Sequence, residues 1–376
     1  MNNNPIFEFS KIHTDGDSSL TDLLGGKGAN LAEMSRMGIQ VPPGFTITTE
    51  VCNYFMEHAE LPDSLEKDIK RSVQKLEEYS GKQFGGDGTP LLLSVRSGGK
   101  ISMPGMMDSI LNIGLNDDNV GKLADTFDDE RFALDSYRRL IQMYSNVVLG
   151  LEHDRFEAVI ANKKRMDNVV SDADFNVDQL NWIIDAFKNT VERFSKAPFP
   201  QDPQEQLLGA VEAVFASWLN DRAVTYRKIN NIPDAWGTGA TVQTMVFGNL
   251  NEKSGTGVAF SRNPSNGEKE LYGEYLMNAQ GEDVVAGIRT PLPLNKKVAT
   301  DGNSLEANHP DAFKEIKDIS DKLETHFKDV QDIEFTIENE KIFLLQTRKA
   351  KRTAQASVKI AIDMVNEGVI SKEEGL

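Results

Sequence analysis

Apolar and polar side chains alternate in several short stretches of the chain, and this alternation is typical of β-strands. One group of these stretches lies before residue 100, and a second group lies between residues 240 and 350. The expected strands are centred on Phe7 and Phe9 and on residues 45–48, 91–95, 241–247, 332–337 and 341–346. Residues 338–340 form a turn between the last two, which are therefore predicted to be a hairpin.

Other stretches carry apolar residues three and four positions apart, which predicts amphipathic helices. The expected helices begin after residue 25, at residue 51, at Pro203 and at residue 311. Residues 121–200 are charged, nearly free of glycine and mostly helical in pattern, so they are interpreted as a helical insertion. A last helix is expected to end at Gly368 and to bury one stripe of residues, namely Ala354, Val358, Ala361 and Val365.

The composition narrows the classes of partner. The chain has 376 residues, enough for two or three domains, and its 58 acidic and 41 basic residues leave a net charge of −17. Nucleic acid and anionic membranes are therefore expected not to be partners. The single cysteine, Cys52, excludes an internal disulfide and a cysteine metal cluster. No targeting signal or membrane-spanning run is recognised, which favours a cytoplasmic setting.

Residues 96–109 are the strongest candidate for binding an anion. Arg96 is expected to lie where a strand ends and a loop rich in glycine and hydroxyl groups begins. The guanidinium group offers a planar fork of donors that suits phosphate oxygens. Glycines allow the backbone of such a loop to approach a ligand closely. The stretch therefore outlines a nucleotide site.

A second glycine-rich stretch, GGKG at residues 25–28, opens a predicted helix. Backbone N–H groups at a helix start attract anions, and Lys27 adds a positive charge. The stretch is not a Walker A loop, because residue 21 is threonine and Lys27 precedes glycine. A plain connection between a strand and a helix remains an alternative. The two Gly-Thr-Gly sequences at residues 237–239 and 255–257 lack the third glycine of the Rossmann pattern. They are interpreted as hairpin turns.

The predicted hairpin carries the main candidates for a metal site. Residues two apart in a strand share a face, so Asp332 and Glu334 present two carboxylates side by side. Turn geometry places Gln346 roughly opposite Asp332, and Arg348 lies two residues further along. Such a set suits Mg²⁺ with phosphates. The alternative is a solvated polar face. The five histidines are scattered and are interpreted as surface residues.

Together these motifs resemble the pyruvate, phosphate dikinase family. The similarity extends from about residue 6 to the end of the chain, and MPGMMD separates dikinases from phosphoenolpyruvate synthase and rifampin phosphotransferase. The stretches that carry it are GGKGANLAEM at 25–34, VPPGF at 41–45, SVRSG at 94–98, MPGMMD at 103–108, DSYRR at 135–139, QTMVFGN at 243–249, NAQGEDVVAG at 278–287 and LQTR at 345–348.

The resemblance implies an α/β (α+β) fold, an ATP-grasp-like nucleotide-binding domain of two subdomains with a helical insertion. The first subdomain would comprise residues 1–120 with 200–239, the insertion 121–199 and the second subdomain 240–353. Residues 354–376 would form a C-terminal helix and the start of a linker. In this family the domain binds MgATP and passes the β-phosphate to a histidine on a swivelling domain. A barrel then delivers phosphate to pyruvate, and full-length members are expected to be homo-oligomers.

The resemblance also implies roles for individual residues. Lys27 and Arg96 would hold the triphosphate, under a loop that contains Gly105 and Ser109. Gln243 would lie near the base. Asp332 and Glu334 would be metal ligands. Gln346 would lie near the metal and the phosphates, and Arg348 would contact the transferring group. Arg96 and Arg348 would be the catalytic residues, acting by position and charge rather than as a general base.

Two departures from the family pattern limit what this chain is expected to do alone. Gly99 replaces the usual alanine, and no histidine lies in the Thr-Ser-His-Ala-Ala-like setting of the phosphorylated one. The sequence SKEE at 371–374 is a capping box that announces a further helix, so the chain is expected to be the front part of a longer protein. The alternatives are a stand-alone phosphotransferase that acts on a partner or small acceptor, and a non-catalytic ATP-binding module.

Overall fold

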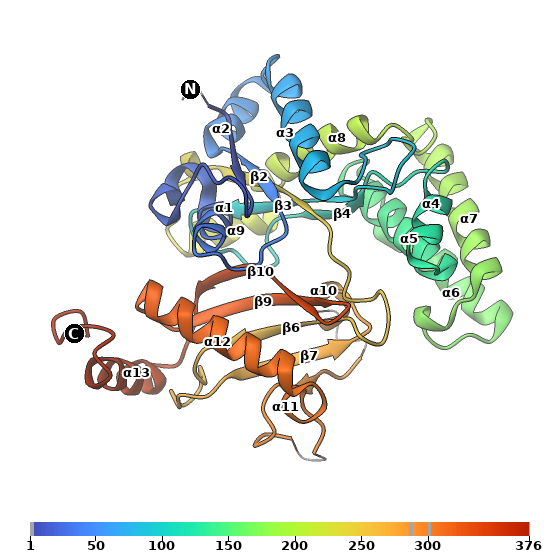
Figure 1. Ribbon diagram of the computed structural model, residues 1–376. Coiled ribbons are helices and arrows are strands. Elements are labelled where there is room, and N and C mark those ends of the chain that lie inside the picture. Colours follow the sequence, from blue (N-terminus) through green and yellow to red (C-terminus); the bar gives the residue numbers. More distant parts are fainter. Residues whose placement is uncertain (1–3, 286–288, 300–301, 376) are drawn as a thin grey trace. The chain divides into compact units, whose positions relative to one another are not determined.

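The computed structural model describes residues 4–285, 289–299 and 302–375. The chain forms two compact units (Figure 1). Unit 1 comprises Met1–Ala32 and Pro43–Met245, and unit 2 comprises Glu33–Pro42 and Val246–Leu376. Each unit contains its own five-stranded antiparallel sheet, so the expected mixed α/β class with two sheet-bearing parts is confirmed. The end of the NAQGEDVVAG stretch, at residues 286–287, lies outside the described residues.

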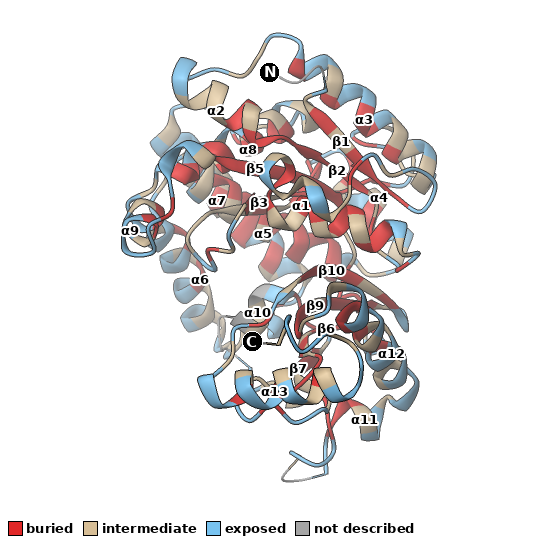
Figure 2. Ribbon diagram, turned by 90° about the vertical axis from the view of Figure 1, so that its left-hand side faces the viewer, coloured by how far each residue is buried: buried red, intermediate tan, exposed pale blue. Residues whose placement is uncertain are grey.

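The sheet of unit 1 has the strand order β1-β2-β5-β3-β4. Its strands are β1 Ile6–Phe9, β2 Gly44–Ile47, β3 Leu93–Gly99, β4 Ser109–Ile113 and β5 Thr238–Thr244. Apolar residues of the central strands, such as Val95 and Val242, are fully buried. In Figure 2 these strands accordingly appear mostly as buried.

Unit 1 contains the helices predicted before residue 220 and two that were not predicted, α3 and α9, and α1 continues into unit 2 at Glu33. The helices are α1 Thr21–Arg36, α2 Thr49–His58, α3 Leu65–Ser80, α4 Val120–Phe127, α5 Glu130–Val147, α6 His153–Asp167, α7 Val177–Ser195, α8 Pro203–Ala216 and α9 Asp221–Ile229. Short 3₁₀ turns occupy Ser18–Leu20, Asp172–Asp174, Ser217–Leu219 and Asp234–Trp236. Helices α4–α7 form the predicted helical segment (Figure 1). Asp202 caps α8 and Pro203 begins it, as helix-start signals predict.

The sheet of unit 2 has the strand order β10-β9-β6-β7-β8. Its strands are β6 Gly255–Phe260, β7 Tyr272–Met277, β8 Leu292–Pro293, β9 Gln331–Glu338 and β10 Lys341–Lys349. Its helices are α10 Gly281–Val285, α11 Leu305–Asn308, α12 Pro310–Phe327 and α13 Ala354–Asn366. Helix α12 runs along the sheet (Figure 1) and buries Ile316 and Leu323.

Strand β5 belongs to the first sheet, whereas the expected second subdomain began at residue 240. β5 pairs with β2 on one side and with β3 on the other. The boundary between the units therefore follows Met245. Alternation along a strand predicts the strand but not the sheet that it joins, because pairing depends on residues far away in the sequence. The proposed limits of the insertion and of the C-terminal part stay predictions.

The interpretation of the two Gly-Thr-Gly sequences as hairpin turns is wrong. Gly239 lies within β5, and residues 255–257 begin β6. A Cβ atom on Gly257 would lie 2.5 Å from the ring of Phe335 and 2.6 Å from the carbonyl oxygen of Glu274. Glycine in a strand often marks such a close approach rather than a turn.

Helix α13 also buries a different face from the one predicted. Ala356, Ile360 and Met364 pack against Val330 and Ala350 of unit 2. Val358, which was expected in the buried stripe, is 63% exposed. Both stripes have helical spacing, so only the position of the partner surface decides between them. Gly368 does follow the helix, with φ of +72°.

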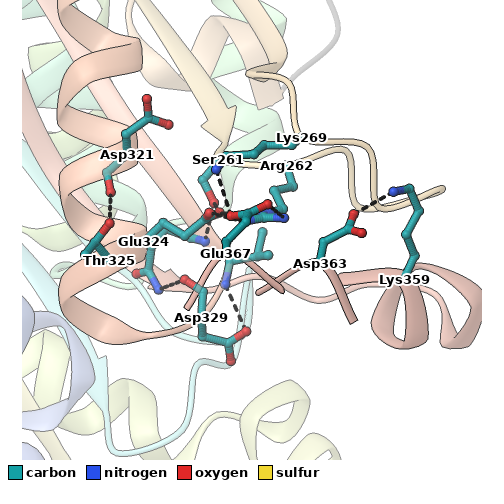
Figure 3. A network of polar contacts seen from close by, with 12 residues as sticks. Ser261, Arg262, Lys269, Asp321, Glu324, Thr325, Asp329, Lys359, Asp363 and Glu367 are labelled. Atoms are coloured by element: carbon teal, nitrogen blue, oxygen red, sulfur yellow. Dashed lines mark hydrogen bonds and ion pairs between the residues drawn. The ribbon is translucent and has the colours of Figure 1, made fainter. Parts of the chain in front are cut away.

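A buried arginine connects the sheet of unit 2 to both α12 and α13 (Figure 3). Arg262, which follows β6 and is fully buried, donates to Glu324 of α12 at 2.7 Å and to Glu367 after α13 at 2.6 Å. Ser261 also donates to Glu324, at 2.5 Å, and the exposed Lys269 donates to Glu367 at 2.7 Å. The network thus fixes α13 to its unit.

The structure also bears on two expectations from the composition, the lack of a membrane-spanning run and the role of the single cysteine. No helix within the described residues combines the length and apolar character that crossing a bilayer requires. Cys52 is buried, and burial raises the pKa of its thiol to about 12. A thiol that is protonated at neutral pH is a poor nucleophile, so Cys52 has the properties of a packing residue.

Candidate functional site

Helix α1 is interrupted at Gly25, where φ is +68° and ψ is 165°. The helical turns that contain Lys27 therefore begin immediately after this residue, as the glycine-rich stretch predicts. Positive φ is readily adopted by glycine and costs other residues free energy. The interruption gives the second part of α1 a separate start, with Lys27 in its first turn.

This helix start packs directly on the backbone of β3. A Cβ atom on Gly25 would lie 1.7 Å from the carbonyl oxygen of Gly98, and one on Gly98 would lie 3.0 Å from the Cβ of Lys27. A Cβ on Gly239, which pairs with Gly98 in the sheet, would lie 2.6 Å from the carbonyl oxygen of Leu24. Three glycines thus remove the side chains that would separate α1 from the sheet, and Lys27 is brought next to β3.

Arg96 and Gln243 lie on one face of the first sheet. Arg96 was expected at the end of a strand. Strand β3 continues to Gly99, so Arg96 lies inside the strand instead. Arg96 pairs with Thr241 and with Ser109, and Gln243 follows Thr241 by two residues in β5. Paired residues share a face, and so do residues two apart in a strand. Arg96, Ser109 and Gln243 are therefore neighbours on the face toward which Gly98 presents Lys27.

The burial of these groups suits a binding surface. Lys27, Arg96 and Ser109 are half-buried, and Gln243 is buried. Gly105 lies in the loop between β3 and β4 with φ of +70°, and no atom lies within 4 Å of the position of a Cβ. The structure thus brings four of the predicted residues of unit 1 together on one face. The contribution of Gly105 stays a prediction.

The packing of α1 on β3 makes a prediction about Gly25. Gly25→Ala should destabilise unit 1 by about 3 kcal/mol, because it combines positive φ with a clash against a backbone oxygen. Gly81→Ala is the matched control, since Gly81 has φ of +66° but nothing within 4 Å of its Cβ position, and should cost about 1 kcal/mol. Urea unfolding followed by tryptophan fluorescence measures both. Equal losses would mean that the close approach to Gly98 carries no energy.

In unit 2 the predicted hairpin is present, but its register differs from the expected one. Arg348 lies opposite Asp332, and Gln346 lies opposite Glu334. The expectation that Gln346 faces Asp332 is therefore wrong. The turn sets Lys341 opposite Glu338, which already differs by one residue from the expected pairing. An irregularity between Leu344 and Gln346 shifts the pairing by one further residue. All four predicted residues remain on one face of the strand pair.

The two cross-strand pairs differ in their electrostatics. Arg348 donates to Asp332 at 2.8 Å, in an ion pair that is mostly buried. Burial raises the pKa of Asp332, and the nearby Glu334 raises it further, while Arg348 partly offsets both effects. Glu334 is half-buried beside the buried amide of Gln346. Asp332 is thus engaged with a cation of the protein, and Glu334 and Gln346 place two further oxygen donors opposite each other on neighbouring strands.

The chemistry of this donor set fits a small hard cation. Mg²⁺ binds through one or two carboxylates and keeps oxygen ligands from water and phosphates. Glu334 and Gln346 supply one carboxylate and one amide oxygen on neighbouring strands. Asp332 lies two residues from Glu334 on the same face, with its carboxylate held by Arg348. The oxygen donors of Glu334 and Gln346 are therefore of the kind that suits a magnesium ion.

Another acidic group was not anticipated from the sequence. Ligand atoms of Glu8, His13 and Asp15 lie within 4.8 Å of one another. His13 and Asp15 are 2.6 Å apart, and Glu8 accepts from Lys75 at 2.8 Å. These charges are thus paired within the protein. His13, like His58, His153 and His326, is exposed and His309 is half-buried, which agrees with their interpretation as surface residues.

Sequence reasoning missed the residues that hold the loop between β3 and β4. Asp108 forms an ion pair with Arg222 and accepts from Asn220 at 2.9 Å. These residues are more than 100 positions apart in the chain, so no local pattern relates them. Met103 is buried against Trp218.

The chain is similar to known proteins. The chain matches the family described as "Pyruvate phosphate dikinase, AMP/ATP-binding domain" at residues 21–83, 56–308 and 293–369. The predicted ATP-grasp-like fold class is thereby confirmed. The match includes all of the candidate residues identified above.

Individual proteins that are similar to nearly all of this chain carry the same family name. The chain is 51% identical over 372 residues to "Pyruvate, phosphate dikinase" of Rickettsia conorii, covering 99% of this chain and 42% of the relative. It is 51% identical over 364 residues to the protein of that name from Clostridium symbiosum, covering 96% and 41%. The chloroplastic protein of Mesembryanthemum crystallinum is 47% identical over 366 residues, covering 97% and 38%. The chain thus spans about two fifths of the length of these curated relatives.

Proposed function

Because the chain belongs to the family of pyruvate phosphate dikinase AMP/ATP-binding domains, we propose that it binds MgATP and serves as the nucleotide-binding part of a dikinase. The observation that carries this proposal is the packing of α1 on β3. It brings Lys27 next to the face of the first sheet on which strand pairing places Arg96, Ser109 and Gln243. Such a face combines two cations and a helix start, which are the features that phosphate groups require.

In this proposal each group has a distinct task. Arg96 binds phosphate oxygens through its planar fork, and Lys27 adds a mobile point charge. Ser109 and the loop that contains Gly105 approach the phosphates through small groups, and Gln243 contacts the base with its amide. These tasks are binding and positioning, which dominate the catalysis of phosphoryl transfer.

The predicted residues of unit 2 are proposed to bind the metal and the transferred group. Glu334 and Gln346 would hold Mg²⁺, with Asp332 as a second candidate ligand. The ion, when bound, neutralises charge on the phosphate oxygens. Arg348 is restrained by Asp332 at 2.8 Å and is proposed to bind the group that is transferred. Arg96 of unit 1 and Arg348 of unit 2 are each proposed as catalytic residues that stabilise charge on the transferred group.

We further propose that the β-phosphate of ATP passes to a histidine on a separate swivelling domain. In the complete reaction, ATP, phosphate and pyruvate are interconverted with AMP, diphosphate and phosphoenolpyruvate. The family membership and the relatives' names support this proposal. Two alternatives are a stand-alone phosphotransferase acting on another acceptor, and a module that binds ATP without catalysis. The acceptor experiment in the Discussion separates them.

Calorimetric titration with ATP tests the binding proposal. Titration with excess Mg²⁺ should give saturable binding with one ATP per chain. Titration in EDTA should weaken the affinity at least tenfold, because the phosphate charge next to Glu334 is then uncompensated. The matched variant Glu340→Ala alters an exposed carboxylate in the turn of the same hairpin and should retain this Mg²⁺ dependence. Absence of heat with Mg²⁺ present would contradict the proposed function.

A further inference from the structure

The loop between β3 and β4 is held in place by contacts that the proposed site does not include. We call residues 100–108 the methionine loop, because they contain Met103, Met106 and Met107. It joins Gly99, the end of β3, to Ser109, the start of β4. Arg96 pairs with Ser109, so the loop closes a hairpin whose base carries two of the proposed phosphate-binding residues.

Asp108, the last residue of this loop, has three polar contacts with one short segment. Its carboxylate forms an ion pair with Arg222 and accepts from the side-chain amide of Asn220 at 2.9 Å. Its backbone N–H donates to the hydroxyl of Ser217 at 3.3 Å. The Asp108 side chain is 19% exposed and that of Arg222 is 51% exposed, so the ion pair is open to water on the side of the arginine.

Arg222 reaches a second point of the loop. Its Nε donates to the carbonyl oxygen of Met106 at 3.0 Å. One guanidinium therefore joins the Asp108 carboxylate to the Met106 backbone, and only arginine offers this fork. Asn220 precedes α9 but makes no capping hydrogen bond with its side chain. Its side-chain amide contacts Asp108 instead.

The methionine loop packs on a hydrophobic cluster that contains Trp218. Met103 packs with Trp218 and Ile232, and Met106 and Met107 lie at the edge of the same cluster. Trp218 donates from its ring nitrogen to the carbonyl oxygen of Asp234 at 2.9 Å. The guanidinium of Arg227 lies 4.1 Å from the centre of the Trp218 ring. Methionine side chains adapt readily to such a surface.

We infer that Asp108 is a positioning residue for nucleotide binding, since its contacts with Arg222 and Asn220 hold the methionine loop in the conformation that meets the phosphates. This inference rests on the proposed function. The loop begins after two glycines and contains Gly105 with φ of +70°, so its backbone has many alternative conformations. A loop that is already ordered binds a ligand more tightly, because the ordering cost does not oppose binding.

The test measures MgATP affinity by calorimetry. Asp108→Ala and Arg222→Ala should each weaken binding about tenfold, and the double variant about as much as either single one, because both changes break the same contact. Arg222→Lys keeps a positive charge for Asp108 and should recover part of the affinity. The matched control is Lys228→Ala, an exposed change at the other end of α9, which should bind as the wild type does.

Thermal unfolding and hydrogen exchange separate positioning from general stability. The variants should keep the wild-type unfolding midpoint, and faster exchange should be confined to the methionine loop while β3 and β5 remain protected. Asn220→Ala provides a milder variant if Asp108→Ala does not fold, because no helix cap is lost with it.

The outcomes distinguish this inference from the proposed function. If the wild type does not bind MgATP, the proposed function fails. If the wild type binds and the Asp108, Arg222 and Asn220 variants bind equally well or more tightly, the positioning role of Asp108 is refuted. Faster exchange throughout the first sheet, with a lower unfolding midpoint, would also overturn it in favour of a purely structural role.

Discussion

Arg96→Ala and Glu334→Ala are each expected to abolish the phosphorylation of a histidine-domain acceptor by this chain. Arg96 is half-buried on β3, opposite Ser109 of β4, and β3 contains no other arginine. Removing one donor that stabilises transition-state charge typically lowers a rate by about 10²–10³-fold. Glu334 is proposed to hold the metal, so its loss should have at least as large an effect.

The measurement uses ATP labelled at the β-phosphate and candidate histidine domains supplied as separate polypeptides. Arg71→Ala, on the exposed surface of α3, and Glu340→Ala, in the hairpin turn, are matched controls that should transfer label normally. Circular dichroism should show that all four variants are folded. Unchanged labelling by both Arg96→Ala and Glu334→Ala would refute the assigned site.

The same assay separates the alternative functions. A dikinase domain should label the histidine domain, and the label should be lost in acid, where phosphohistidine is unstable. A phosphotransferase with another acceptor should leave the histidine domain unlabelled but consume ATP when its own acceptor is added. A non-catalytic module should bind ATP and label none of the polypeptides. Each outcome leads to a different assignment for this chain.

Arg262→Met is expected to cause the largest loss of stability in unit 2, about 3–5 kcal/mol. Arg262 is fully buried and pairs with Glu324, whose side chain is only 6% exposed. Removing the arginine leaves a buried carboxylate without its cation, and such single changes cost far more than the pair contributes. Burial by itself raises the pKa of Glu367, but the hydrogen bonds from Arg262 and Lys269 lower it overall.

Two further variants make this expectation specific. Lys269→Ala removes only the exposed cation next to Glu367 and should cost less than about 1 kcal/mol. The double variant Arg262→Met with Glu324→Leu should recover most of the loss, because apolar groups can replace a buried ion pair. An Arg262→Met chain as stable as Lys269→Ala would contradict the role of the network.

The choice of measurement follows from the distribution of tryptophans. Trp182, Trp218 and Trp236 all belong to unit 1, so fluorescence does not report on Arg262. Circular dichroism during urea unfolding gives the free energy of unfolding, provided that the two units unfold separately. Hydrogen exchange in α12 and α13 gives a local value. We expect α13 to lose protection first, because Glu367 is one of its links to the sheet.

The hairpin illustrates how far the sequence alone specified the site. Alternation of apolar and charged residues predicted both strands and placed Asp332 and Glu334 on one face, which the structure confirms. The register was mispredicted, because the irregularity between Leu344 and Gln346 leaves no local signal. Because the pairing is shifted by two positions, Asp332 lies opposite Arg348 and Glu334 lies opposite Gln346. The assignment of the metal pair therefore depended on the tertiary structure.

What the sequence by itself determined about this protein is local: the approximate positions of many helices and strands, the helix start at Lys27, the polar face of the hairpin and the family. What only the tertiary structure decided is long-range: the sheet that β5 joins, the buried face of α13, the packing of Gly25 on Gly98 and the contact of Asp108 with Arg222. The physical reason is that periodicity and capping act within a few residues, whereas pairing and burial depend on surfaces that meet only when the chain is folded.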